Sequence, residues 1–86
     1  MMTSHKIRLG CLRPAGDEWE QPTGEEVREV LKMCGFSGSQ TAHFLGLGST
    51  GSRTVRRWTG GETPIPYAAW ALLCEQAGLG MIWKSS

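Results

Sequence analysis

The chain has 86 residues, a mass of 9.4 kDa and a formal net charge of +1, and 40% of its residues are hydrophobic. This length suits one small domain and is well below that of the usual dinucleotide-binding enzyme. No stretch approaches the roughly 20 apolar residues of a membrane span, and the N-terminal stretch MMTSHKIRLGCLRPAG lacks the apolar run of a signal peptide. We therefore expect a cytoplasmic protein.

The cysteines and histidines show no spacing typical of a metal site or a disulfide framework. Cys11, Cys34 and Cys74 are odd in number and widely separated, and His5 and His43 form no pair at helical spacing. The chain also lacks paired carboxylates, or a nucleophile with a base, in a context that would form a pocket. We expect reduced thiols, no metal, no cofactor and no catalytic residues.

Residues 1–22 are predicted to form an N-terminal arm, because the stretch RPAGDEWEQP in this section is acidic and rich in turn formers. The preceding stretch HKIRLGCL alternates Ile7, Leu9 and Cys11 with polar residues or glycine, which is the period of a strand. This pattern favours an extended arm or a short β-strand at 6–12.

A first helix is predicted at 23–34. Thr23 and Glu26 form a T-x-x-E capping box, in which each side chain reaches a free backbone amide of the other residue. Gly35 suits the left-handed position that ends a helix. The apolar stripe consists of Val27, Val30, Leu31 and Cys34.

A second helix begins directly afterwards, because Ser37 and Gln40 repeat the capping box as S-x-x-Q. It can hold only GSQTAHFL before Gly46 ends it, and Leu47 can cover its end. Two short helices that are joined so tightly must cross at a steep angle. The inward residues of the second helix are expected to be Ala42 and Leu45.

The segment RTVRRW is expected to lie in a third helix, because Val55 and Trp58 share one face. Its start stays open among Ser49, Thr50 and Ser52, which are all suitable N-caps. The other faces of this helix carry Arg53, Arg56 and Arg57.

A fourth helix is predicted at 66–77, with proline in its first turn and Gly78 as its stop. The tail at 79–86 stays apolar and is expected to dock on another surface. The elements together predict an all-α fold, a compact bundle of four to five helices preceded by the arm. The fourth helix is expected to bury Ile65, Ala69, Leu72 and Leu73.

The charges are unevenly distributed along the chain. Six of the eight acidic residues lie between positions 17 and 29, whereas residues 30–61 contain no acid. This middle segment carries a charge of +4 by itself, which indicates a surface that meets a polyanion. Its four cations are Lys32, Arg53, Arg56 and Arg57.

The glycines of GLGSTGS raise a competing interpretation, because Gly46, Gly48 and Gly51 spell the dinucleotide fingerprint G-x-G-x-x-G. That fingerprint requires a strand before the first glycine and a completed βαβ unit after the third. Here a capped helix comes first, no second strand follows, and no lysine follows Gly51 as a P-loop would need. We interpret the glycines as turn residues between two helices, and we expect no nucleotide.

The run GFSGSQTAHFLGLG, followed by RTVRRWTGGETPIP, resembles the helix-turn-helix of the phage-repressor-like (Cro and XRE type) DNA-binding family. Ser37 matches the cap of the first motif helix, and Ala42 matches the small residue where the two helices touch. The resemblance covers about 23–78, and it has two departures. Gly38 stands where the family has a glutamine that often touches a DNA phosphate, and the turn is three residues longer than usual. The remaining matches are Leu45 and Gly46, which end the first motif helix, and Val55 and Trp58, which form the core of the second.

The resemblance implies a site for double-stranded DNA on the third helix. Arg53 and Arg57, at i and i+4, are expected to read base edges together with Ser52. Contacts to phosphates set the register of the protein on DNA rather than the sequence that is read. The residues expected to make them are Ser37, Gly38, Ser49, Thr50, Arg56 and Lys32.

Members of this family usually dimerise on a palindromic operator, so the resemblance also implies a homodimer. The apolar tail 79–86 and the segment 6–12 are both candidates for the two-fold contact. The interface residues are expected among Tyr67, Trp70, Met81, Ile82 and Trp83.

The sequence as a whole predicts a sequence-specific transcriptional regulator, a small dimeric repressor of phage, plasmid or mobile-element type. The alternative is an antitoxin-like or regulatory protein-binding module, whose apolar ends would cover a partner protein. An enzyme is the third alternative, and nothing in the sequence supports it.

Overall fold

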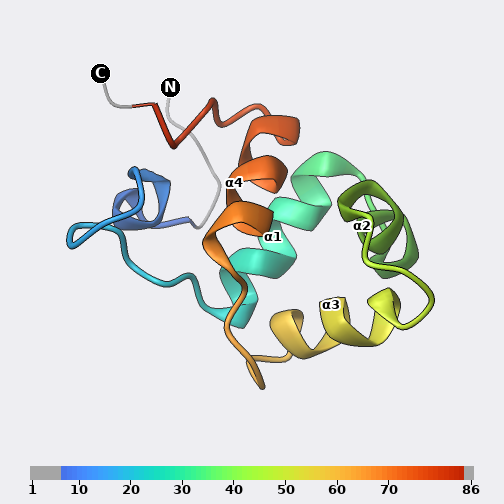
Figure 1. The fold of residues 1–86 in the computed structure, drawn as a ribbon. Helices are drawn as coiled ribbons and strands as arrows, with labels where there is room; N and C mark the ends of the chain where they lie inside the picture. Colours follow the sequence, from blue (N-terminus) through green and yellow to red (C-terminus); the bar gives the residue numbers. More distant parts are fainter. Residues whose placement is uncertain (1–6, 85–86) are drawn as a thin grey trace.

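In the computed structural model, which describes residues 7–84, the chain folds into a short 3-10 helix and four α-helices. α1 (Gly24–Cys34) lies in the middle and packs against α3 (Gly51–Thr59) and α4 (Tyr67–Gln76), while α2 (Gly38–Leu45) packs on α3 (Figure 1). The described part of the chain contains no strand, which confirms the all-α prediction, and none of its helices is long and apolar enough to span a membrane. The 3-10 helix, η1 (Leu9–Leu12), precedes the four α-helices.

Both predicted capping boxes are present. The Thr23 hydroxyl accepts from the Glu26 amide at 3.2 Å, and the Glu26 carboxylate accepts from the Thr23 amide at 2.7 Å. Ser37 and Gln40 make the same pair of bonds, at 3.1 and 2.8 Å. Each helix then ends at a glycine in the left-handed region, with φ of 75° and 70°. These local signals therefore place α1 and α2 as predicted.

The core lies between α1, α3 and α4. Trp70 is fully buried, whereas Leu72, which was predicted to face inward, is 48% exposed. That prediction is wrong because α4 is apolar on every side, so periodicity does not reveal its buried face. The largest fully buried side chains on these three helices are Val27, Val30, Val55, Trp70, Leu73 and Cys74.

The predicted strand at 6–12 is also wrong over its described part, and Lys6 lies outside the described residues. Leu9–Leu12 forms η1 instead, in which the Cys11 amide donates to the Arg8 carbonyl at 3.0 Å, and an ion pair with α1 fixes Arg8, the residue before η1. Arg8 donates three hydrogen bonds of 2.9 Å to the Glu26 carboxylate, one from its backbone and two from its guanidinium group. Glu26 is only 4% exposed, so this contact seats η1 on the start of α1.

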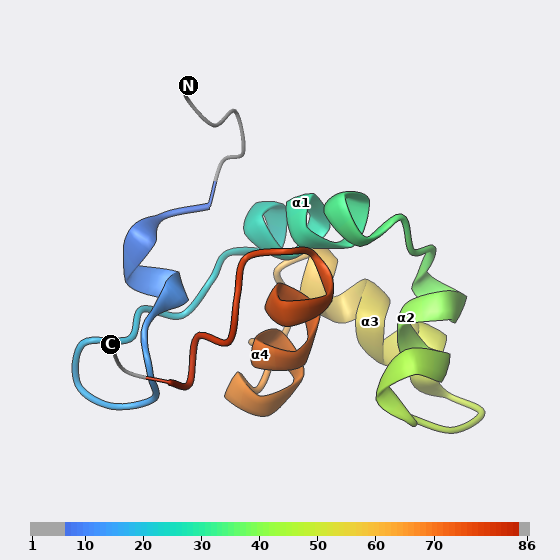
Figure 2. The ribbon, with the colours of Figure 1, turned by 90° about the horizontal axis from the view of Figure 1, so that it is seen from above.

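The segment 13–22 continues across the same end of the molecule, opposite α2 (Figure 2). The backbone carbonyl of Cys11 accepts hydrogen bonds from the indole of Trp19 at 2.9 Å and from the indole of Trp70 at 2.8 Å. Ile7 and Cys11 are themselves buried in the core. The described part of the predicted arm is therefore packed into the same core as the helices.

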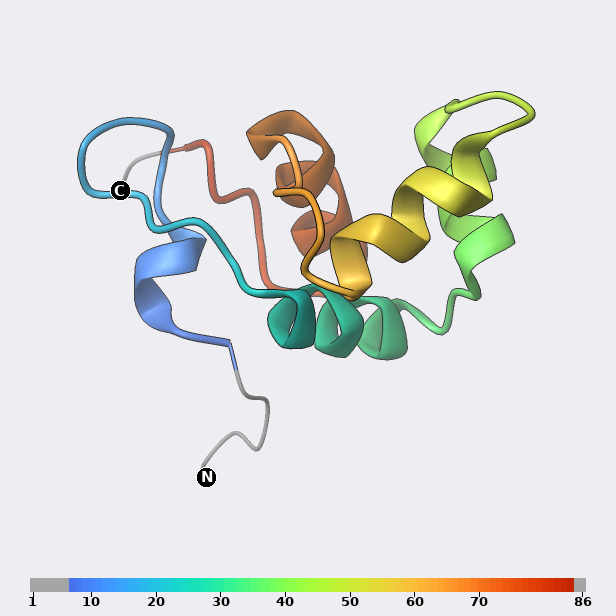
Figure 3. The same ribbon diagram turned by 90° about the horizontal axis from the view of Figure 1, so that it is seen from below.

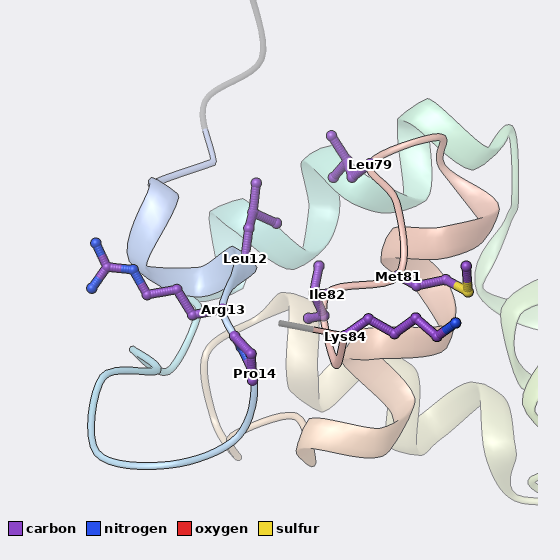
Figure 4. A pocket seen from close by; sticks show the side chains of 7 residues that line it. All are labelled: Leu12, Arg13, Pro14, Leu79, Met81, Ile82 and Lys84. Carbon is purple, nitrogen blue, oxygen red and sulfur yellow. The ribbon is translucent and has the colours of Figure 1, made fainter. Parts of the chain in front are cut away.

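The described part of the C-terminal tail, residues 79–84, lies against the N-terminal segment. Ile82 is buried, with 5% of its surface exposed, and Leu79 packs partly against the core. The two segments face each other across an open pocket of about 300 Å³ (Figure 4). The prediction that the tail packs on another surface is therefore confirmed for Ile82, and that surface is the core of this chain itself. The pocket is lined by Leu12, Arg13, Pro14, Leu79, Met81, Ile82 and Lys84.

Candidate nucleic-acid interface

α2 and α3 form one end of the molecule and are joined by the turn 46–50 (Figure 3). The turn starts where Gly46 leaves α2, and Leu47 then donates from its amide to the Ala42 carbonyl at 3.0 Å. Gly48 has a φ of 83°, a backbone conformation that residues with a side chain rarely adopt. The first two glycines of the fingerprint pattern therefore serve the turn, as the sequence predicts.

The third glycine has a different role. Gly51 is the first residue of α3 and is buried against α2. A Cβ atom at this position would lie 2.6 Å from the Cβ of Ala42 and 2.7 Å from the Cβ of Leu47. The absence of a side chain thus lets the two helices approach closely, and this contact sets the angle at which α3 leaves the turn.

We predict that Gly51→Ala destabilises the protein by about 1 to 3 kcal/mol, because the added methyl group overpacks the contact between α2 and α3. The matched control is Gly38→Ala, where a Cβ meets nothing within 4 Å. That control should leave stability unchanged or raise it by up to about 1 kcal/mol. Urea unfolding followed by circular dichroism measures both, and equal midpoints for Gly51→Ala and wild type would contradict the close contact.

α3 has one buried face and one charged face. Val55 and Trp58 are 1% and 5% exposed, which confirms that both belong to the core. Arg53, Arg56 and Arg57 are all exposed, and none of them forms an ion pair with any residue in the range 7–84. Three guanidinium groups without a carboxylate partner therefore point into solvent from nine residues of helix.

A hydrogen bond joins the first turns of α2 and α3. The hydroxyls of Ser39 and Ser52 lie 3.2 Å apart, so the predicted base-contacting Ser52 is held beside α2. Ser39 was not among the predicted site residues. Its place three residues before Ala42, on the side of α2 that meets α3, was the available signal.

The start of α3 is settled at Gly51, with Thr50 as its N-cap. Thr50 makes no side-chain capping bond, and Ser49 and Thr50 are both exposed. Two hydroxyls beside a helix N-terminus suit an anion, because the helix dipole and its free amides favour negative charge there. The structure thus leaves these side chains accessible where backbone contacts were predicted.

Three of the predicted phosphate contacts lie around one hollow. Lys32, Gly38 and Arg56 line an open depression of about 320 Å³ between α1, the start of α2 and α3, whereas Ser37 is exposed beside it. The same hollow includes Arg28, which the sequence analysis missed. Its spacing of four residues from Lys32, on the polar face of α1, was the signal that could have found it.

The predicted dimer residues fall into two groups. Trp70 and Ile82 are 0% and 5% exposed, which corrects their assignment to an interface, because a buried core side chain has no surface to offer a partner. Met81 and Trp83 are 48% and 41% exposed. Tyr67 is half-buried and donates its hydroxyl to the Arg13 carbonyl at 3.1 Å.

The cysteines have no reactive geometry. Cys11, Cys34 and Cys74 are free thiols, and the described residues contain no group of three His, Cys, Asp or Glu side chains that could hold a metal ion. Burial, with a smaller contribution from Glu26, raises the pKa of Cys11 to about 11, and burial raises the pKa of Cys74 to about 12. Both thiols are therefore protonated at neutral pH, and the Cys11 thiol donates to the buried Glu26 carboxylate, 3.6 Å away.

Comparison with known proteins finds two relatives, both from Escherichia coli and both described as transcriptional repressor protein KorC. One is 62% identical over 84 residues, which cover 98% of this chain and 98% of the relative. The other is 61% identical over 83 residues, which cover 96% of each chain. No family model matches the chain, and no solved structure matches it.

Proposed function

The chain belongs to the KorC family of transcriptional repressors, and from this premise we propose that it represses transcription by binding double-stranded DNA through α3. The observation that carries the proposal is the charged face of α3. Three arginines without ion-pair partners among residues 7–84 stand opposite the buried Val55 and Trp58. A helix that is anchored on one side and cationic on the other fits the major groove of DNA.

The roles of the arginines follow from their positions on the helix. Arg53 and Arg57 are one turn apart, so both reach the same side of α3, and each can donate two hydrogen bonds to the O6 and N7 atoms of a guanine. Ser52 adds a hydroxyl beside them. Arg56 points toward the hollow next to α1, where a backbone phosphate is the natural partner. Ser49 and Thr50 hold a second phosphate at the start of α3.

A titration of labelled duplex DNA from upstream of the protein's own gene tests this proposal. We expect saturable binding that weakens steeply as salt rises, because released counterions drive the association. A folded wild-type protein that binds neither this duplex nor an unrelated one at low salt would contradict a DNA-binding repressor. It would instead favour a repressor that acts through a protein partner.

We also propose that the protein acts as a homodimer on a palindromic operator. Apolar side chains form a shallow hollow of about 340 Å³ on the outer face of α4, and its wall includes the half-exposed Leu72 and Trp83. A two-fold axis through this face would let two copies cover it mutually. The protomer measures 36 Å in its longest dimension, comparable to the roughly 34 Å between half-sites one helical turn apart.

We predict that the double variant Leu72→Ser, Trp83→Ser is monomeric where the wild type is dimeric. Each lost side chain should weaken association by about tenfold or more, since burying a large apolar group contributes about 1.5 to 3 kcal/mol. Sedimentation velocity measures the change. Leu9→Ser is the matched control, because Leu9 is 75% exposed in the N-terminal segment. If only the Leu9→Ser control dissociated the dimer, the interface would lie in the N-terminal segment instead.

A further inference from the structure

The hollow between α1 and α3 concentrates positive charge on a surface outside the face of α3 that carries Arg53 and Arg57. Arg28 and Lys32 border it from α1, one turn apart, and Arg56 borders it from α3. The floor is apolar and includes Leu31 and Val55. None of the residues that line it carries a carboxylate, so its three cations face an otherwise uncharged depression.

Two of the three acidic residues of α1 lie on the other side of Arg28 and Lys32. Glu25 and Glu29 border a separate, smaller depression that shares Arg28 and Lys32 with the first. Lys32 is engaged there, because its ammonium group lies 3.9 Å from the Glu29 carboxylate. Arg28 forms no ion pair with any residue in the range 7–84. Arg28 is therefore the cation of α1 that is free to serve the hollow.

The opening of the hollow is unobstructed at the start of α2. Gly38 lines it without a side chain, and a Cβ atom there would meet nothing within 4 Å. The volume of the depression, about 320 Å³, is larger than that of a single phosphate group, so it admits a phosphodiester with part of its neighbouring sugar. Its place beside Arg56 puts it on the flank of α3, where a DNA strand that borders the groove would pass.

We propose that this hollow binds one backbone phosphate of the DNA, held mainly by Arg28 and Arg56 with Lys32 in support. The proposal rests on the proposed function and deepens it, since it names a phosphate site on α1 outside the helix that reads bases. Two guanidinium groups suit this ligand because each presents parallel N–H donors to phosphate oxygens. The site contributes affinity and register for any DNA sequence, and no preference among bases.

The test compares Arg28→Ala with Arg13→Ala, which also removes one exposed arginine but lies at the opposite end of the molecule. Arg13 is 3.8 Å from its partner Glu18, so its loss is expected to be neutral. Affinity is measured at several salt concentrations for the upstream duplex and for an unrelated duplex. For Arg28→Ala we expect about a 3- to 10-fold loss on both duplexes, and a salt slope that falls by about 0.9 for each protomer. Arg28→Lys should keep most of the wild-type salt slope, because lysine retains the positive charge.

Ethylation interference supplies a second readout. In the wild type, ethylation of one phosphate in each half-site should block binding through this hollow. In Arg28→Ala that one interference should disappear while the others remain. Circular dichroism confirms that each variant is folded.

If Arg28→Ala kept the wild-type affinity and salt slope while Arg53→Ala still lost binding, the phosphate site would be overturned. The proposed function would then stand. A loss confined to the upstream duplex would also overturn it, because the residue would then read bases. If the wild type binds neither duplex, the proposed function fails first and the phosphate site fails with it.

Discussion

Replacing Arg53 or Arg57 by alanine is expected to lower the affinity for each operator half-site by about 5- to 140-fold. This range corresponds to the roughly 1 to 3 kcal/mol of discrimination that a bidentate contact between arginine and guanine contributes. Both side chains are exposed, and neither forms an ion pair with a residue in the range 7–84. Their removal therefore breaks no contact that holds the fold, and the loss should appear in binding alone.

Fluorescence anisotropy with the upstream duplex and an unrelated duplex distinguishes reading from simple charge loss. Arg53→Ala and Arg57→Ala should narrow the gap between the two duplexes, whereas Arg56→Ala should weaken both about equally. Arg13→Ala serves again as the distant control. If the folded double variant Arg53→Ala, Arg57→Ala kept wild-type affinity and preference, α3 would not be the reading element.

The second large effect concerns stability and centres on Glu26. Burial raises the pKa of this carboxyl, but hydrogen bonds from Arg8 and from the Thr23 amide outweigh it and lower the pKa from 4.5 to about 2. A difference of this size between folded and unfolded chains corresponds to about 3 kcal/mol. We expect Glu26→Gln to lose about this much at pH 7, since glutamine preserves the capping box but carries no charge.

The sign of the pH dependence follows from the lowered pKa. The charged form of Glu26 is favoured in the folded state, so its contribution is complete above about pH 4.5 and is lost as the pH falls toward 2. The wild type should therefore become less stable over this interval. Glu26→Gln should lack that component, so the two unfolding curves should converge near pH 2.

Urea unfolding at a series of pH values measures this convergence. Glu18→Gln is the control, because Glu18 is 84% exposed and 3.8 Å from Arg13, and it should change stability by less than about 0.5 kcal/mol. A constant gap between wild type and Glu26→Gln from pH 7 to pH 2 would mean that the charge of Glu26 contributes nothing to folding.

The parts of the fold that were predicted correctly depend on short-range chemistry. A capping box spans four residues, and a glycine ends a helix through its own φ, so α1 and α2 could be placed from local sequence. The charged and buried faces of α3 follow equally from the spacing of Val55 and Trp58. The candidate reading residues were accessible to sequence analysis for the same reason.

The errors arose where distant residues decide the structure. The alternation at 6–12 favoured a strand, but this segment is held by distant residues: Arg8 bonds to Glu26, 18 positions away, and the Cys11 carbonyl bonds to Trp70, 59 positions away. In α4 the apolar residues surround the helix, so only packing on α1 distinguishes Trp70 from Leu72. The hollow was missed because it joins Arg28 to Arg56 across two helices.

The carbonyl of Cys11 has a consequence for how the molecule opens. It is the shared acceptor of two indoles, and Trp70 among them is completely buried. Detaching the N-terminal segment would strand that indole N–H inside the core, at a cost of about 1 to 3 kcal/mol beyond the lost packing. Local unfolding at this end is thus coupled to unfolding of the helical core. The amides of η1 and α4 should exchange with solvent together, as one cooperative unit.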